Sequence, residues 1–161
     1  MIKTILVPVD GSDHADRAVE LGADLAAKYG ATLELYHVLL AGQNVPDEIR
    51  QLSDKEGAEE PALAVGGGYV EASLPRAVLE DIAVKLLERA QKRAEEHGAT
   101  DVKSAWGQGP ATEQILERAK EVGADMIVMG SRGLSDLKGL VVGSVSHKIS
   151  HLFDGTVVTV K

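Results

Sequence analysis

Short apolar runs alternate with longer stretches of helical apolar spacing along most of this chain. Runs rich in β-branched residues predict strands over residues 4–9, 32–38, 102–105, 126–129 and 156–160. Apolar positions three or four apart predict helices over residues 15–29, 75–97, 110–122 and 142–152. Because strands alternate with helices, we expect an α/β fold, a single-domain open five-stranded parallel sheet with helices on both faces.

The segment from residue 39 to residue 74 breaks this alternation. It contains Gly42, Pro46 and the run Gly66-Gly67-Gly68, and its first half is strongly acidic. We expect a variable, partly mobile insertion with a short helix near residues 46–55 and the greatest mobility over residues 43–70. The whole chain, residues 1–161, is otherwise expected to form one domain.

Composition excludes several classes of protein. The net charge of −8 has the wrong sign for a phosphate-backbone binder, and one Trp, three Tyr and one Phe are too few for a base-stacking surface, so no nucleic-acid partner is expected. The absence of cysteine excludes disulfides and thiolate sites. The first apolar run meets Asp10 too soon for a signal peptide, and no run is long enough for membrane insertion, so a cytoplasmic location is expected.

Two predicted loops carry candidate chemistry at the same edge of the sheet. One follows the first strand at residues 8–12, and the other follows the fourth strand at residues 130–133 and leads to Gly143-Ser144. Glycines allow backbone N–H groups to approach an anion closely, and a helix start adds partial positive charge. From residue types alone, a phosphate cradle and a plain turn are equally good interpretations of the second loop.

Other candidate residues favour structural roles. Asp10 could accept a ribose or adenine hydrogen bond or hold a metal through water, but an Asx-turn before the helix is the simpler interpretation. His147 and His151 have a metal-ligand spacing without the glutamate of H-E-x-x-H, which favours two partly exposed helix histidines. Gly107-Gln108-Gly109 lacks a third glycine, and no G-x-x-x-x-G-K-[ST] motif occurs.

Four segments of the chain resemble the universal stress protein family: ILVPVDGS, LYHV, GADMIVMGSRG and GSVSHK. The spacing of Gly130, Gly133 and Gly143-Ser144 fits the G-2x-G-9x-G-[S/T] motif of the members of that family that bind ATP. The resemblance implies the strand order 3-2-1-4-5, with the reversal between strands 1 and 4. It also implies ATP as the ligand, with Mg²⁺ or Mn²⁺ bound alongside it.

The family's site can be carried over by position. Around the adenosine, the resemblance implies Pro8, Val9, Asp10 and Val38. At the ribose and phosphates, it implies Met129, Gly130, Ser131, Arg132, Gly133, Gly143, Ser144, Val145 and Ser146. From its charge, Lys138 in the nine-residue spacer is also expected to reach the phosphates.

Three functions remain open at this point. An ATP-binding module in stress response or signalling is favoured, because no general base is visible beside the expected γ-phosphate position. The alternatives are a slow ATPase or autophosphorylating enzyme that uses the same pocket, and a dimeric scaffold. By the family order, residues 157–160 form a β-branched edge strand, so we expect a homodimer through this C-terminal edge; the sequence names no downstream protein partner.

Overall fold

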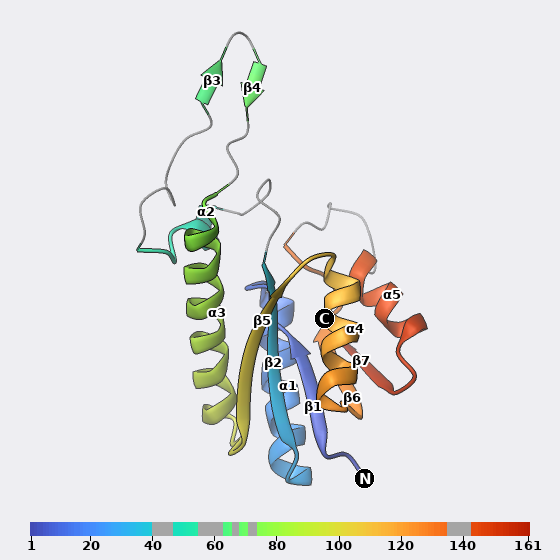
Figure 1. Ribbon diagram of the computed structural model, residues 1–161. Helices are drawn as coiled ribbons and strands as arrows, with labels where there is room; N and C mark the ends of the chain where they lie inside the picture. The colour runs from blue at the N-terminus through green and yellow to red at the C-terminus, as the bar shows by residue number, and fades with distance from the viewer. Residues whose placement is uncertain (40–46, 55–62, 66–67, 71–73, 135–142) are drawn as a thin grey trace.

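A five-stranded parallel sheet forms the centre of the computed structural model, which describes residues 1–39, 47–54, 63–65, 68–70, 74–134 and 143–161 (Figure 1). Its strands are β1 (Thr4–Pro8), β2 (Thr32–Leu39), β5 (Val102–Gln108), β6 (Met126–Gly130) and β7 (Thr156–Val160). They lie in the order β5-β2-β1-β6-β7, and every neighbouring pair is parallel. Counted within this sheet, the order is the predicted 3-2-1-4-5, so the fold prediction is confirmed.

Helices cover both faces of the sheet. They are α1 (Asp13–Tyr29), α3 (Arg76–Glu96), α4 (Ala111–Val122) and α5 (Ser144–Leu152). The apolar residues of α1 and α3 pack with Ile5 and Val7 of β1 in one core cluster, and those of α4 and α5 pack with Leu6 in another. Strand β1 is therefore buried on both faces, which explains its continuous apolar run.

Helix α1 begins after Ser12 and ends before Gly30, and both residues cap it. The Ser12 hydroxyl accepts a hydrogen bond from the Ala15 N–H at 3.2 Å, and Gly30 follows the helix with a φ of 63°. A left-handed residue at this position closes the last turn, and glycine adopts it without a steric cost. The short loop that follows leads straight into β2, which lies beside β1.

Four expectations need correction or extension. The third strand of the sheet continues to Gln108, because it pairs with β2 along its whole length. The short helix of the insertion, α2 (Asp47–Arg50), is confined to one turn, and β3 (Leu63–Val65) pairs with β4 (Gly68–Val70) in an antiparallel arrangement that the sequence did not predict. Leu152, which continues the apolar spacing of the predicted last helix, is 61% exposed, and Phe153 packs against the core instead. Half of the residues covered by the mobility prediction, residues 43–70, lie outside the described residues.

Candidate functional site

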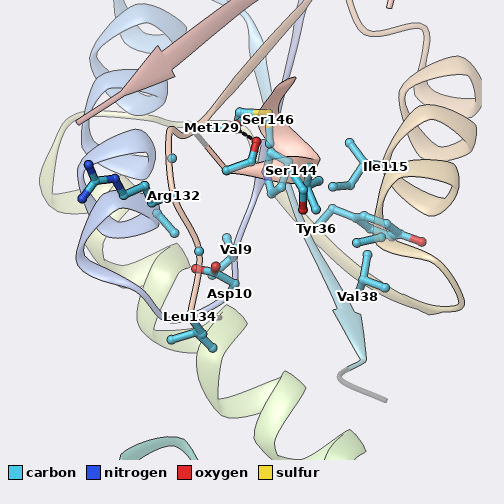
Figure 2. Close-up of a pocket in the computed structure, with 17 residues that line it drawn as sticks. Val9, Asp10, Tyr36, Val38, Ile115, Met129, Arg132, Leu134, Ser144 and Ser146 are labelled. Carbon is cyan, nitrogen blue, oxygen red and sulfur yellow. Dashed lines mark hydrogen bonds between the residues drawn. The ribbon is translucent and has the colours of Figure 1, made fainter. Parts of the chain in front are cut away.

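A pocket of about 320 Å³ opens beyond the carboxyl ends of β1 and β6, where the strand order reverses (Figure 2). Open parallel sheets bind their ligands at such a reversal. The predicted site residues that line the pocket are Pro8, Val9, Asp10, Val38, Met129, Gly130, Arg132, Gly133, Gly143, Ser144, Val145 and Ser146. The structure thus brings together both candidate loops and the start of α5.

Among the predicted site residues that the structure describes, Ser131 alone does not line the pocket. It is only 3% exposed and connects the elements behind the pocket wall. Its N–H donates to the Val160 carbonyl at 2.7 Å, and its own carbonyl accepts from the Gly143 N–H at 2.7 Å and the Ser146 hydroxyl at 3.0 Å. Ser131 therefore ties the loop after β6 to both β7 and the start of α5.

Asp10 uses its two carboxylate oxygens differently. Oδ1 accepts hydrogen bonds from the Ser12 N–H at 2.9 Å and the Ser12 hydroxyl at 2.7 Å, which confirms the Asx-turn predicted from the residues. Oδ2 faces the loop after β6, so that a Cβ on Gly133 would lie 2.7 Å from it. The glycine at position 133 allows the two loops to come this close.

Gly130 allows a second close approach, between the end of β6 and helix α1. A Cβ on Gly130 would lie 2.9 Å from the Cβ of His14 and 3.0 Å from the Arg132 carbonyl oxygen. The Nδ1 atom of His14 lies 3.3 Å from both the Val160 carbonyl oxygen and the Ser131 hydroxyl. The glycine-rich loop is therefore packed against α1 as well as against β7.

The pocket is lined by apolar side chains and by the start of helix α5. Val9, Val38 and Met129 are among the apolar residues, together with Tyr36 and Ile115. Gly143, which also lines the pocket, precedes α5 without a side-chain cap on the helix. The first N–H groups of a helix lack intrahelical acceptors and carry partial positive charge, so the start of α5 suits an anion.

Sequence and structure comparisons agree on the family of this chain. A sequence profile described as "Universal stress protein family" matches residues 1–161. The chain belongs to the universal stress protein family. It is 31% identical to the universal stress protein YxiE of Bacillus subtilis over 164 residues, with 100% of each chain covered. It is also 37% identical over 153 residues to a universal stress protein from Thermus aquaticus, with 92% and 91% of the two chains covered.

Among solved structures, the fold is similar to that of a universal stress protein in complex with cAMP. The two chains are 26% identical, the TM-score is 0.64, and 99% of this chain and 96% of the other are covered. The resemblance to the universal stress protein family that four segments of the sequence indicated is therefore confirmed. The motif glycines at 130, 133 and 143 all line the one pocket described above.

Sequence reasoning missed part of the pocket of this universal stress protein. The additional lining residues are Ala15, Tyr36, Ala111, Ile115 and Leu134. Tyr36 shares a strand face with the predicted Val38, so strand alternation could have found it. Ala111 and Ile115 are one helical turn apart at the start of α4, a spacing that places both on one face. Lys138 lies outside the described residues.

Tyr36 is held in place by neighbours that the sequence did not connect to the site. Its hydroxyl donates to Gln114 Oε1 at 3.4 Å, and a Cβ on Gly107 would overlap that hydroxyl. The Arg118 guanidinium lies 5.9 Å from the ring centroid, and burial raises the pKa of Tyr36. The glycine at position 107, at the predicted end of a strand before a helix, therefore leaves room for the ring in the pocket wall.

A buried ion pair supports the same wall. Glu34 is 2% exposed, and its Oε1 accepts from Nη2 of Arg118 at 2.6 Å and from Nε at 3.0 Å. Glu34 and Tyr36 lie two residues apart on β2, so their side chains share a face of the sheet. Arg118 thereby connects α4 to the strand that carries Tyr36.

The remaining histidines lie outside the pocket. His37 is buried, its Nδ1 donates to the Val9 carbonyl at 2.7 Å, and burial lowers its pKa, as expected for a packed residue. His147 and His151 are exposed on α5, as predicted. Within the described ranges, no three His, Cys, Asp or Glu residues cluster as metal ligands, and no helix is long and apolar enough to cross a membrane.

Proposed function

We propose that this chain binds ATP in the pocket between β1 and β6 and serves as a nucleotide-binding module in stress response or signalling. The observation that carries the proposal is the convergence of Gly130, Gly133 and Gly143 on one pocket that is lined by apolar side chains and by a helix start. The apolar side chains suit a purine base, and the N–H groups suit phosphates. The likeness to a universal stress protein solved with cAMP supports an adenine nucleotide.

Local charge has to overcome the global charge of the chain. The net charge of −8 repels a triphosphate, so the N–H groups at the start of α5 supply the local attraction. The guanidinium of Arg132 extends away from the other pocket residues in Figure 2 and adds to this attraction only when the side chain turns inward. The Ser144 hydroxyl adds a donor at the same edge. Lys138 remains a predicted contributor from the spacer between Gly133 and Gly143.

The residues present also fit a divalent cation beside the phosphates. Asp10 lines the pocket, and its Oδ2 faces the loop after β6 that also lines it. Mg²⁺ and Mn²⁺ favour carboxylate oxygens, and Mg²⁺ is commonly held by one or two carboxylates with phosphates and water. Bound there through Asp10, the ion would neutralise phosphate charge.

Titration calorimetry tests the proposal. Untagged protein is titrated with ATP in the presence of Mg²⁺, with GTP as the comparison, and ADP release is followed in parallel. Saturable binding of ATP without ADP release supports the binding module. Release of ADP that disappears in Asp10→Asn supports the slow ATPase instead, and the absence of any nucleotide binding overturns the proposal.

We also propose that β7 pairs with β7 of a second copy to form a homodimer. Strand β7 lies at an edge of the sheet, and its residues Val157, Val158 and Val160 are only half-buried. An open β-branched edge favours pairing with another strand. Light scattering should give a dimer mass at micromolar concentration, and Thr159→Lys, which charges an exposed position of the edge, should shift the protein toward monomer. A monomeric parent protein would contradict the proposal.

The cytoplasmic location stays a prediction.

A further inference from the structure

Helix α5 carries a second group of ligand-type side chains on its solvent side, away from the pocket residues. His147 and His151 are one turn apart and exposed, and their Nε2 atoms lie 3.3 Å from each other. The ring centroids are 4.6 Å apart, and the rings meet edge to face at 71°. The two Nε2 atoms therefore face each other at hydrogen-bonding distance instead of pointing apart.

This separation matches the requirement of a shared metal ion. Two imidazole nitrogens bound to one tetrahedral Zn²⁺ at about 2.0–2.1 Å stand roughly 3.3–3.4 Å apart. The observed 3.3 Å lies in that range, so an ion can be held with little change of either side chain. The helix backbone maintains the spacing, because residues four apart are neighbours on a helix surface.

We propose that His147 and His151 form a two-imidazole binding site for a borderline divalent transition-metal ion: Cu²⁺, Ni²⁺ or Zn²⁺. Neutral imidazole suits these ions, whereas Mg²⁺ and Ca²⁺ prefer oxygen ligands. The site is thus chemically distinct from the Asp10 position in the pocket, and it does not depend on nucleotide binding.

The composition of the site determines its expected strength. Because no third His, Cys, Asp or Glu joins the pair among the residues that the structure describes, water fills the other coordination positions. Affinity should follow the Irving–Williams order, with Cu²⁺ bound more tightly than Ni²⁺ or Zn²⁺. An ion bridging His147 and His151 also holds one turn of α5, so saturating metal should raise the melting temperature.

The experiment titrates untagged protein with CuCl₂, NiCl₂ and ZnCl₂ separately in a buffer that does not chelate metals. The parent protein should bind one ion with the strongest signal for Cu²⁺. His147→Ala and His151→Ala should each weaken metal binding at least about tenfold. Once one imidazole holds the ion, the second is already close to it at a high effective concentration, and each variant loses this advantage. Both positions are exposed, so circular dichroism should remain unchanged.

A residue swap provides a control of the same composition. His151→Leu combined with Leu152→His keeps both imidazoles on α5 but moves one to a position five residues from His147; Leu152 is 61% exposed and tolerates the change. Binding should fall as in the single variants, whereas His97→Ala, at an exposed histidine elsewhere, should leave it intact. No binding at millimolar metal, or full affinity in the swapped variant, would overturn the site. Histidine NMR signals of the unmodified protein give a second readout: zinc must shift the rings of His147 and His151 together.

Discussion

Gly133 lies directly against the carboxylate of Asp10: a Cβ at position 133 would stand 2.7 Å from Asp10 Oδ2. The two residues belong to different loops, one after β6 and one after β1, and both line the pocket at the strand-order reversal. Gly133 does not have a positive φ, unlike Gly11 or Gly109, so backbone strain is not what requires glycine here. Space beside Asp10 requires it.

Substitution at this position should therefore impair the site sterically. Gly133→Val forces its side chain against Asp10 and away from the proposed phosphate position, and ATP affinity should fall by about 100-fold, the loss expected for two charge-assisted hydrogen bonds. Ser144→Ala removes one hydroxyl and keeps the backbone N–H, so its loss should be smaller. Calorimetric titration with ATP measures both.

A second glycine variant shows whether a loss of ATP affinity is specific to position 133. Gly123→Asn changes a glycine where no atom lies within 4 Å of a new Cβ, at a left-handed position that asparagine tolerates. ATP affinity and circular dichroism should match the parent protein. Full ATP affinity in a folded Gly133→Val variant would contradict the proposed phosphate site.

Ser146 should position the start of α5. Its buried hydroxyl donates to the carbonyls of Ser131 and Gly143, both at 3.0 Å. Ser146→Ala should lower the free energy of unfolding by about 1 kcal/mol and also weaken ATP binding, since the loop and the helix lose a shared donor. Urea unfolding and calorimetry test the two effects. Ser150→Ala on the same helix, where the hydroxyl donates to the Ser146 carbonyl at 2.8 Å, should leave ATP affinity unchanged.

The ion pair between Glu34 and Arg118 should matter more than an ordinary surface pair. Arg118→Met leaves the carboxylate of Glu34 buried without its cation and should cost about 3 kcal/mol of unfolding free energy. Replacing both residues, Glu34→Leu with Arg118→Leu, should recover most of that loss. Glu121→Gln removes the exposed partner of Arg118 and should cost less than about 0.5 kcal/mol. Equal costs for Arg118→Met and Glu121→Gln in urea unfolding would show that burial of Glu34 is unimportant.

His37 should make the protein less stable in mild acid. Burial lowers its folded-state pKa more than the Val9 carbonyl and the charge of Asp10 raise it. The unfolded chain then binds the proton more readily, so stability is complete above the unfolded pKa of about 6.5 and declines as the pH falls from there toward the lowered folded pKa. His37→Asn keeps a donor for the Val9 carbonyl and should flatten this part of the profile. Urea unfolding between pH 5 and pH 8 measures it; identical slopes for the two proteins would contradict the assignment.

The residues of the chain determined its elements and the spacing of its motif. Apolar periodicity located the strands of the sheet and the long helices, because the spacing of apolar residues along the chain depends on whether one or two faces of an element are buried. Ser12 and Gly30 marked the ends of α1 for equally local reasons. The spacing of Gly130, Gly133 and Gly143 pointed to one edge of the sheet, where the structure places all three.

Only the tertiary structure decided which side chains enter the pocket and which contacts they make. Ser131 belongs to the motif segment, yet hydrogen bonds to Val160 and Gly143 hold it behind the pocket wall. Tyr36 enters the pocket because Gly107, on the neighbouring strand β5, leaves space for its hydroxyl. The convergence of His147 and His151 likewise depends on their rotamers on a folded helix. Periodicity records which side of an element is buried, whereas contacts between residues distant in sequence arise only when the elements pack together.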